Sequence, residues 1–322
     1  MSAPAPVRDP LTEDRELQKQ IAEQAQVDSS TAASPAVRAF QFFLVPLLIV
    51  GACVVVYAVL NWVVANPRSA HEWLKDVKEG GPNTRPHAAL QFAQTLRRME
   101  HPDTSLTKDV MEVYRSAGPN EDELRRYLAT CLGYLRDPMA SDLLLEAVKN
   151  DKNMETRAAA LDSLGTIKDP RTLPALVKLL DDPEDLVRKY AAFNAGAVAE
   201  KANGDERAAA IEALRKKLSD PASDVTWNAA FALAYFLGDG TGTDTLKKML
   251  DRKYLGSRIN RNDPNWQMLE SRAMFTACNA AARLKDESFL PILKELTDKG
   301  KERDSDVRFA AHQAINKIQE KK

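Results

Sequence analysis

The sequence predicts an all-α protein, namely an α-solenoid of stacked helix pairs preceded by one transmembrane helix. Two observations carry this prediction. An apolar run of 26 residues extends from Phe40 to Ala65, and a short motif with alanines after an arginine-like position recurs seven times between residues 83 and 318. Such an array is one continuous structure, so the 322 residues need not divide into two globular domains.

The first segment, residues 1–38, is predicted to be a disordered acidic tail. It carries six acidic residues against four basic ones, and few large apolar side chains. A segment of this composition cannot bury enough apolar surface to offset the entropy lost on folding.

The second segment, residues 39–66, is predicted to be a transmembrane helix, with membrane contact through residues 40–65. Crossing a hydrocarbon core takes about 20 apolar residues, whereas a buried core helix usually shows 10–14. A cleaved signal peptide is the other alternative, but its apolar stretch is only about 7–15 residues long. We therefore expect a retained single-pass anchor in a bacterial inner or plasma membrane.

The orientation follows from the flanking charges. Arg68, Lys75 and Lys78 follow the apolar run, whereas only Arg38 precedes it closely. Basic residues favour the cytoplasmic side, so the C-terminal solenoid is expected there. Residues 67–82 then form a connecting and capping helix that ends at Gly80 and Gly81.

The remaining residues, 83–322, are predicted to form about seven repeats. The arginine-like position of the motif, called here the marker, falls at residues 85, 125, 157, 188, 226, 270 and 308, at intervals of 31 to 44 residues. This spacing is typical of units built from two helices. Alanine often stands three residues after the marker, where another helix must approach closely. The recurrent arginine is expected to pair with an aspartate of the adjacent repeat, which is a structural role.

The central unit resembles the HEAT-repeat superfamily, and in particular the short bacterial repeats called PBS-lyase HEAT-like. The matching residues are Asp169-Pro170, Leu176, Leu180, Asp182, Val187-Arg188 and Ala191-Ala192. The resemblance implies an armadillo-like α-solenoid. It leaves function open, because the family includes lyases, adaptors and assembly scaffolds.

Composition and motifs argue against several function classes. The formal net charge is −1, which lacks the positive excess of a nucleic-acid-binding protein. The three cysteines and four histidines are scattered, and we find no phosphate-binding loop or catalytic motif. We therefore predict no catalytic residue, no metal site and no cofactor.

Two regions are candidates for partner binding. The insertion Arg252–Gln267 lies in the longest interval and combines basic with aromatic residues, which are enriched at interface hot spots. Its candidates are Arg252, Lys253, Tyr254, Arg258, Arg261 and Trp266. The second region replaces the usual marker by Thr226-Trp227, and its candidates are Trp227, Tyr190 and Arg272. The alternatives are a solvated loop for the first region and core packing for the second.

The leading functional hypothesis is a membrane-anchored HEAT-repeat scaffold or adaptor that binds a partner protein, as an accessory subunit of a membrane complex. One alternative, implied by the resemblance alone, is an enzyme related to lyases that attach bilins to phycobiliproteins. A membrane-tethered regulatory or sensory protein is the other alternative.

Overall fold

The computed structural model describes residues 15, 17–24, 40–65 and 68–320. Two compact units divide the chain, Met1–Arg68 and Ser69–Lys322. Every regular element in the described ranges is helical, so the all-α prediction is confirmed for these residues. Most of the predicted disordered tail lies outside the described residues, and residues 17–24 form a helix.

The first unit corrects the membrane prediction. The apolar run is not one uninterrupted α-helix: Phe40–Leu44 (η1) is π-helical, and helix α3 (Val45–Ala65) begins beside Pro46, which has no backbone N–H to donate. Among the described residues, no helix combines the length and the apolar character needed to span a bilayer. This finding contradicts the predicted single-pass localisation and cytoplasmic orientation, and it leaves the transmembrane helix over 39–66 and the membrane contact through 40–65 without support.

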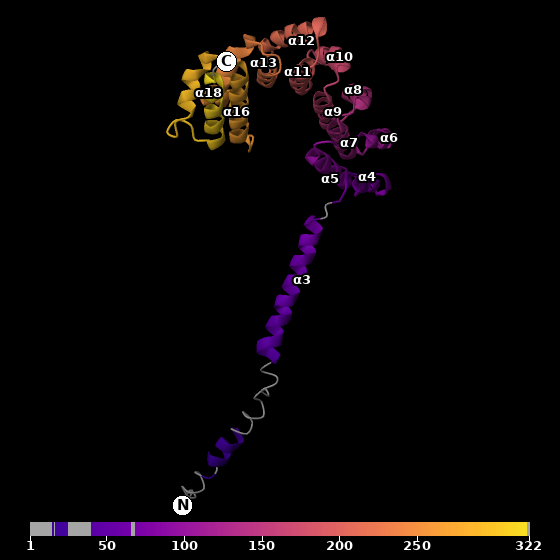
Figure 1. The fold of residues 1–322 in the computed structure, drawn as a ribbon, viewed down its shortest axis with the longest axis vertical. Coiled ribbons are helices and arrows are strands. Elements are labelled where there is room, and N and C mark those ends of the chain that lie inside the picture. Colours follow the sequence, from indigo (N-terminus) through magenta and orange to yellow (C-terminus); the bar gives the residue numbers. More distant parts are fainter. Residues whose placement is uncertain (1–14, 16, 25–39, 66–67, 321–322) are drawn as a thin grey trace, which may run out of the picture. The chain divides into compact units, whose positions relative to one another are not determined.

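The second unit consists of helix pairs that follow one another along an arc (Figure 1). The second helices of the pairs lie along the inner edge of this arc. The seven pairs within residues 69–320 are α4 (Ala70–Glu79) with α5 (Arg85–Arg98), α6 (Thr107–Ser116) with α7 (Asp122–Leu135), α8 (Ser141–Asn150) with α9 (Met154–Ile167), α10 (Leu173–Leu179) with α11 (Asp185–Ala199), α12 (Gly204–Lys216) with α13 (Ser223–Tyr235), α14 (Thr243–Met249) with α16 (Trp266–Leu284), and α17 (Leu290–Leu296) with α18 (Ser305–Gln319).

Each predicted marker lies on the second helix of a pair. The helix predicted to cap and connect the array is α4, the first member of the first pair. The short helix α15 (Arg252–Gly256) belongs to the insertion between α14 and α16. Turns of 3-10 helix complete the unit: η2 (Thr104–Leu106), η3 (Pro138–Ala140), η4 (Pro170–Thr172), η5 (Lys217–Ser219), η6 (Gly240–Gly242) and η7 (Glu287–Phe289).

Local sequence explains where the helices begin. Ser69 and Glu72 form a capping box at the start of α4, so two unpaired backbone N–H groups are satisfied reciprocally. At η4, the side chain of Asp169 accepts a hydrogen bond from the backbone N–H of Arg171, and Pro170 takes the first position. Proline fits there because its missing N–H would have no intrahelical partner.

Small residues let the second helices approach one another. Gly133, eight residues after its marker, faces Ser163 of the next pair, and a Cβ on that glycine would lie 2.5 Å from the Ser163 Oγ. A Cβ on Gly196 would lie 2.6 Å from the Ala232 Cβ. Glycine is therefore required by the distance between α7 and α9 and between α11 and α13.

Four of the five marker arginines form ion pairs with acidic residues of the following pair; three of the acids are aspartates, as predicted, and the first is a glutamate. These pairs, named here the arginine ladder, are Arg85–Glu121 at 2.7 Å, Arg125–Asp151 at 2.8 Å, Arg157–Asp182 at 3.4 Å and Arg188–Asp220 at 3.0 Å. The last is bidentate, since Nε and Nη2 of Arg188 donate to the two carboxylate oxygens of Asp220. The ladder thus links successive repeats.

Candidate functional site

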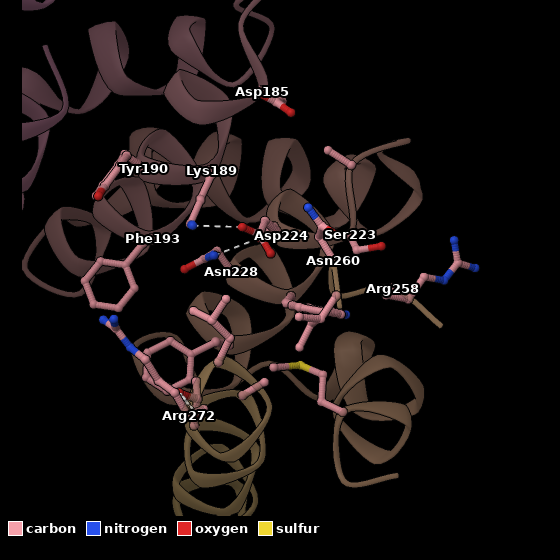
Figure 2. A pocket seen from close by; sticks show the side chains of 18 of the residues that line it. Asp185, Lys189, Tyr190, Phe193, Ser223, Asp224, Asn228, Arg258, Asn260 and Arg272 are labelled. Carbon is pink, nitrogen blue, oxygen red and sulfur yellow. Dashed lines mark hydrogen bonds and ion pairs between the residues drawn. The ribbon is translucent and has the colours of Figure 1, made fainter. Parts of the chain in front are cut away.

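A groove on the inner edge of the solenoid is the main candidate site in the described part of the chain. It has a volume of about 630 Å³ and lies over α9, α11, α13 and α16, with the insertion at one side (Figure 2). Three of its lining residues on α11 stand one, two and five positions after the marker, at Lys189, Tyr190 and Phe193. The same offsets on α13 give Trp227, Asn228 and Phe231. The repeat therefore builds this surface by bringing equivalent positions side by side.

Aromatic rings form the apolar floor of the groove. The rings of Phe193 and Phe231 stack with centroids 5.7 Å apart, and the ring of Tyr235 stacks on Phe231 at 4.9 Å. Phe193 and Tyr190 are half-buried, whereas Phe231 is only 8% exposed. The floor thus offers aromatic surface that the fold leaves partly uncovered.

Polar groups are arranged around this floor. Lys189 forms an ion pair with Asp224 at 2.8 Å, and the Asn228 amide donates to the backbone carbonyl of Asp224 at 2.7 Å (Figure 2). Arg258 and Arg272 take part in no ion pair among the described residues. They are the cations of the groove that remain available to a ligand.

Asp162 is the acidic counterpart on α9. Burial raises the pKa of its carboxyl group, because surrounding protein atoms disfavour the charged form, and the positive charge of Arg272 opposes this shift. The side chain opens onto the groove, so a ligand would change its surroundings directly.

A second hollow continues the groove toward the N-terminal pairs. Its volume is about 530 Å³, and it shares Asp162 and Tyr190 with the groove. Arg126 lines it, with its guanidinium 4.8 Å from the ring centroid of Tyr127 and an ion pair to Glu155. The inner surface is therefore continuous from α5 to α16.

The predicted site residues separate into two groups. Tyr190, Trp227, Arg258 and Arg272 all line the groove, although Trp227 is only 7% exposed. The Trp227 indole N–H donates to the Tyr254 hydroxyl at 3.4 Å. Trp227 therefore lines the groove and also packs the insertion against the solenoid. Partner binding and core packing, the two alternatives for this region, are thus compatible.

Four of the five other predicted residues line a separate hollow, named here the cationic pocket, and Tyr254 lines neither of the two. Arg252, Lys253, Arg261 and Trp266 lie there, in a volume of about 310 Å³. Residues that the sequence did not suggest complete it: Glu270, Lys301 and Arg303. The insertion therefore serves two surfaces, with Arg258 on one and Arg261 on the other.

A buried ion-pair network forms the base of the cationic pocket. Arg252 donates from Nε and Nη2 to the two carboxylate oxygens of Glu302, at 2.9 and 2.6 Å, and from Nη1 to Glu270 at 3.2 Å. Both carboxylates are only 1% exposed. Because a buried charge is costly without a partner, this arginine fixes the start of the insertion against α16 and the loop before α18.

Two further arginines flank the Trp266 ring. The guanidinium carbons of Arg261 and Arg303 lie 4.0 and 5.6 Å from its centroid. Arg261 also lies 2.7 Å from the Glu270 Oε1, an ion pair that lacks the alignment of a hydrogen bond, and Arg303 lies 3.5 Å from Oε2. The aromatic face and the carboxylate together hold both cations in place.

One signal for the missed residues was present in the sequence. Glu270 occupies a marker position. At the same position, four of the preceding helix pairs have an arginine that belongs to the ladder. An acid at that position implies a basic partner supplied from elsewhere. Lys301 and Arg303 carried no such signal, since charged loop residues are usually solvated.

The described residues contain no group of three or more histidine, cysteine, aspartate or glutamate side chains placed to hold a metal ion. Cys131 and Cys278 are buried, and burial raises the pKa of the Cys278 thiol to about 12. Neither thiol is therefore suited to act as a thiolate nucleophile near neutral pH.

Comparisons with known proteins give similarities in fold. The complex of CpcE and CpcF of phycocyanin lyase from Nostoc sp. is 21% identical, with 79% of this chain and 96% of that chain covered and a TM-score of 0.49. The X-ray structure of the Escherichia coli protein YibA gives 17% identity, coverage of 82% and 97%, and a TM-score of 0.44. Human deoxyhypusine hydroxylase gives 16%, coverage of 78% and 96%, and 0.35.

These structural likenesses are distant and carry no assignment of function. The search among curated proteins gives no match. Within the solenoid, residues 115–197, which run from the end of α6 into α11, match the family model for HEAT repeats.

Proposed function

We propose that the chain is an adaptor that binds a segment of a partner protein in the groove over α9, α11, α13 and α16. The observation that carries this proposal is the partly uncovered aromatic floor of Tyr190 and Phe193 in a groove also lined by Arg258 and Arg272, two cations without ion pairs to the described residues. Large aromatic side chains and arginine dominate the energy of protein interfaces, so a surface of this composition favours protein recognition.

The groove would hold its ligand by two kinds of contact. Apolar side chains of the partner would cover Phe193 and Tyr190, and this burial would supply most of the affinity. Arg258 and Arg272 would pair with acidic groups of the partner, and Asp162 with a basic group. Such charges set the direction and register of a bound segment more than its affinity.

Site-specific photocrosslinking tests the proposal. A benzoyl-phenylalanine at Thr276, in the groove, should crosslink a discrete partner in the native cell, whereas the same residue at Lys178, on the first helix α10, should not. The partner, once identified and purified, should then bind wild type and lose affinity for a Tyr190→Ala, Arg272→Ala double variant. Equal affinity for that variant would overturn the assignment of the groove.

The bilin-lyase alternative and the regulatory alternative remain predictions from sequence. Mixing the purified chain with phycocyanobilin distinguishes the lyase-like reading, since a bound linear tetrapyrrole would shift its visible absorbance. A shift that disappears in the same double variant would replace the adaptor proposal by a bilin-binding one. A regulatory role would instead require that partner binding change an activity of that partner.

A further inference from the structure

We propose that the cationic pocket is a second binding site, which takes an acidic, carboxylate-rich segment of a partner protein. The site lies apart from the groove and does not depend on the proposed function of the groove. It stands on three observations: a positive charge excess, cations that are exposed yet fixed in position, and an aromatic face among them.

The charge excess follows from the residues of the pocket. Five cations line it or reach into it, and they are Arg252, Lys253, Arg261, Lys301 and Arg303. Three carboxylates oppose them, Glu270 and Glu302 at the base and Glu295 beside Lys301. The surplus is therefore two positive charges, although the whole chain has a formal net charge of −1. The positive potential is local to this pocket.

The inner and outer cations have different roles. Arg252 is engaged with both buried carboxylates and is not available to a ligand. The outer cations face solvent, with side chains 45% exposed at Arg261, 58% at Lys301 and 57% at Arg303. Lys253 is exposed and forms no ion pair within the described residues, and the contact of Lys301 with Glu295 is long, at 3.7 Å. Lys253 and Lys301 thus remain only weakly compensated, whereas Arg261 and Arg303 share the one carboxylate of Glu270 with Arg252.

The pocket is also organised before a ligand arrives. Glu270 and the ring of Trp266 hold the guanidinium groups of Arg261 and Arg303, so a ligand need not order these side chains on binding. Fixing long side chains in advance lowers the entropic cost of association. Guanidinium groups bind carboxylates in a planar, often bidentate geometry, and the Trp266 face can cover the methylene groups of a glutamate.

An acidic protein segment fits these features better than a nucleic acid does. A nucleic-acid-binding surface needs basic residues along an extended face, whereas this cluster is compact and the formal net charge of the chain is −1. The cations come from two separate segments, 252–261 and 301–303, so they can contact successive acidic side chains of one chain.

The test uses a fluorescein-labelled peptide of alternating glutamate and glycine, with binding to the purified full-length chain followed by anisotropy. The triple variant Lys253→Glu, Lys301→Glu, Arg303→Glu should bind at least about tenfold more weakly than wild type, because each reversal turns an attraction into a repulsion. It leaves Arg252, Glu270 and Glu302 intact.

The matched control is Lys149→Glu, Lys178→Glu, Lys201→Glu. All three lysines are exposed on the first-helix side or in loops, and the change in net charge is the same. This control should bind the peptide within about twofold of wild type, since screening weakens charge interactions beyond about 10 Å. Equal losses in both triple variants would overturn the proposal, because general electrostatics would then account for the binding.

Two further arms distinguish the ligand and the two sites. A peptide in which phosphoserine replaces glutamate tests the alternative source of negative charge, and binding of that peptide alone would replace the carboxylate assignment. The Tyr190→Ala, Arg272→Ala variant of the groove should retain wild-type affinity for the glutamate peptide. Loss of the peptide in that variant would place its site in the groove and contradict the assignment of the pocket. Thermal midpoints close to wild type establish that each variant is folded.

Discussion

The contact between α11 and α13 and the contact between α16 and α18 are both accompanied by an ion pair, but the marker residue is an arginine on α11 and a glutamate on α16. In the first, Arg188 on the helix donates two hydrogen bonds to Asp220 of the next pair. In the second, Glu270 stands at the marker position and Arg252, from the insertion, donates two hydrogen bonds to Glu302. The comparison teaches that a bidentate guanidinium–carboxylate pair can join successive repeats whichever segment supplies the arginine.

The difference also decides which surfaces are exposed. In a regular ladder pair the second helix supplies the arginine and the turn before the next second helix supplies the acid, as in Arg188 with Asp220. The pair of Arg252 with Glu302 attaches the insertion to the solenoid, and Arg261 and Arg303 form ion pairs with Glu270. The cationic pocket is therefore a consequence of one acid at position 270.

The largest loss of stability is expected on removing Arg252, the arginine that the insertion supplies to Glu302. Arg252→Ala leaves two buried carboxylates without their main partner, and breaking a buried pair in this way costs about 3–5 kcal/mol. Arg188→Ala leaves only Asp220 and should cost about 1.5–3 kcal/mol, the range for hydrogen bonds to charged groups. Urea unfolding of both variants measures the difference, and a smaller loss for Arg252→Ala would contradict the stronger role of the pair of Arg252 with Glu302.

The next largest loss of stability is expected where the second helices α11 and α13 approach each other closely. Gly196→Ala places a Cβ against Ala232, and overpacking of this kind costs about 1–3 kcal/mol. The control is Gly81→Ala, where no atom lies within 4 Å of the new Cβ, so the change should stay within about 0.5 kcal/mol. Thermal unfolding compares them. A neutral Gly196→Ala would mean that α11 and α13 separate at little cost.

The pH dependence of the regular pair gives a third prediction. Burial favours the neutral acid, but hydrogen bonds from Arg188 and the Ala222 N–H prevail and lower the pKa of Asp220. The pair therefore stabilises the fold above the unfolded pKa of about 3.9, and this stability is lost as the pH falls through the lower folded value.

Asp220→Asn is the variant that checks this sign. It should be less stable than wild type near neutral pH, and the difference should narrow as the pH drops below about 4. Chemical denaturation at a series of pH values follows the gap. A gap that is constant with pH would show that the charge of Asp220 does not contribute.

The smallest loss of stability is expected at the contact of Trp227 with Tyr254, between α13 and the insertion. Tyr254→Phe removes the acceptor of a long hydrogen bond from Trp227, at 3.4 Å, and leaves the ring contact with centroids 6.4 Å apart. We expect a loss of less than about 1 kcal/mol. Urea unfolding measures it, and a loss comparable to that of Arg252→Ala would make this hydrogen bond, and not the ion pairs, the main attachment of the insertion.

Much of the solenoid could be predicted because its information is local and repeated. The marker with its following alanines identifies the second helix of every pair, and the pairing of Arg188 with an aspartate of the next repeat was predicted from the same pattern. The membrane assignment was wrong, since it relied on the length of an apolar run and not on the helix that forms within it.

The candidate site could be predicted only in part. Basic and aromatic residues identified the insertion, and Tyr190, Trp227, Arg258 and Arg272 do share one groove. The path of the insertion depends on contacts with residues some 50 positions away, such as the 2.6 Å pair of Arg252 with Glu302. No local pattern reports such a contact, so the division of the insertion between two surfaces was not foreseeable.

The most direct test of the pair that the insertion supplies is a double-mutant cycle on Arg252 and Glu302, with Arg252→Met, Glu302→Gln and the double variant compared in urea unfolding. If the pair replaces a regular ladder contact, the two changes should couple by about 0.5–3 kcal/mol, in the same direction and range as Arg188→Met with Asp220→Asn. Additive changes at Arg252 and Glu302, beside clear coupling at Arg188 and Asp220, would contradict the claim that the insertion supplies the missing arginine of the ladder.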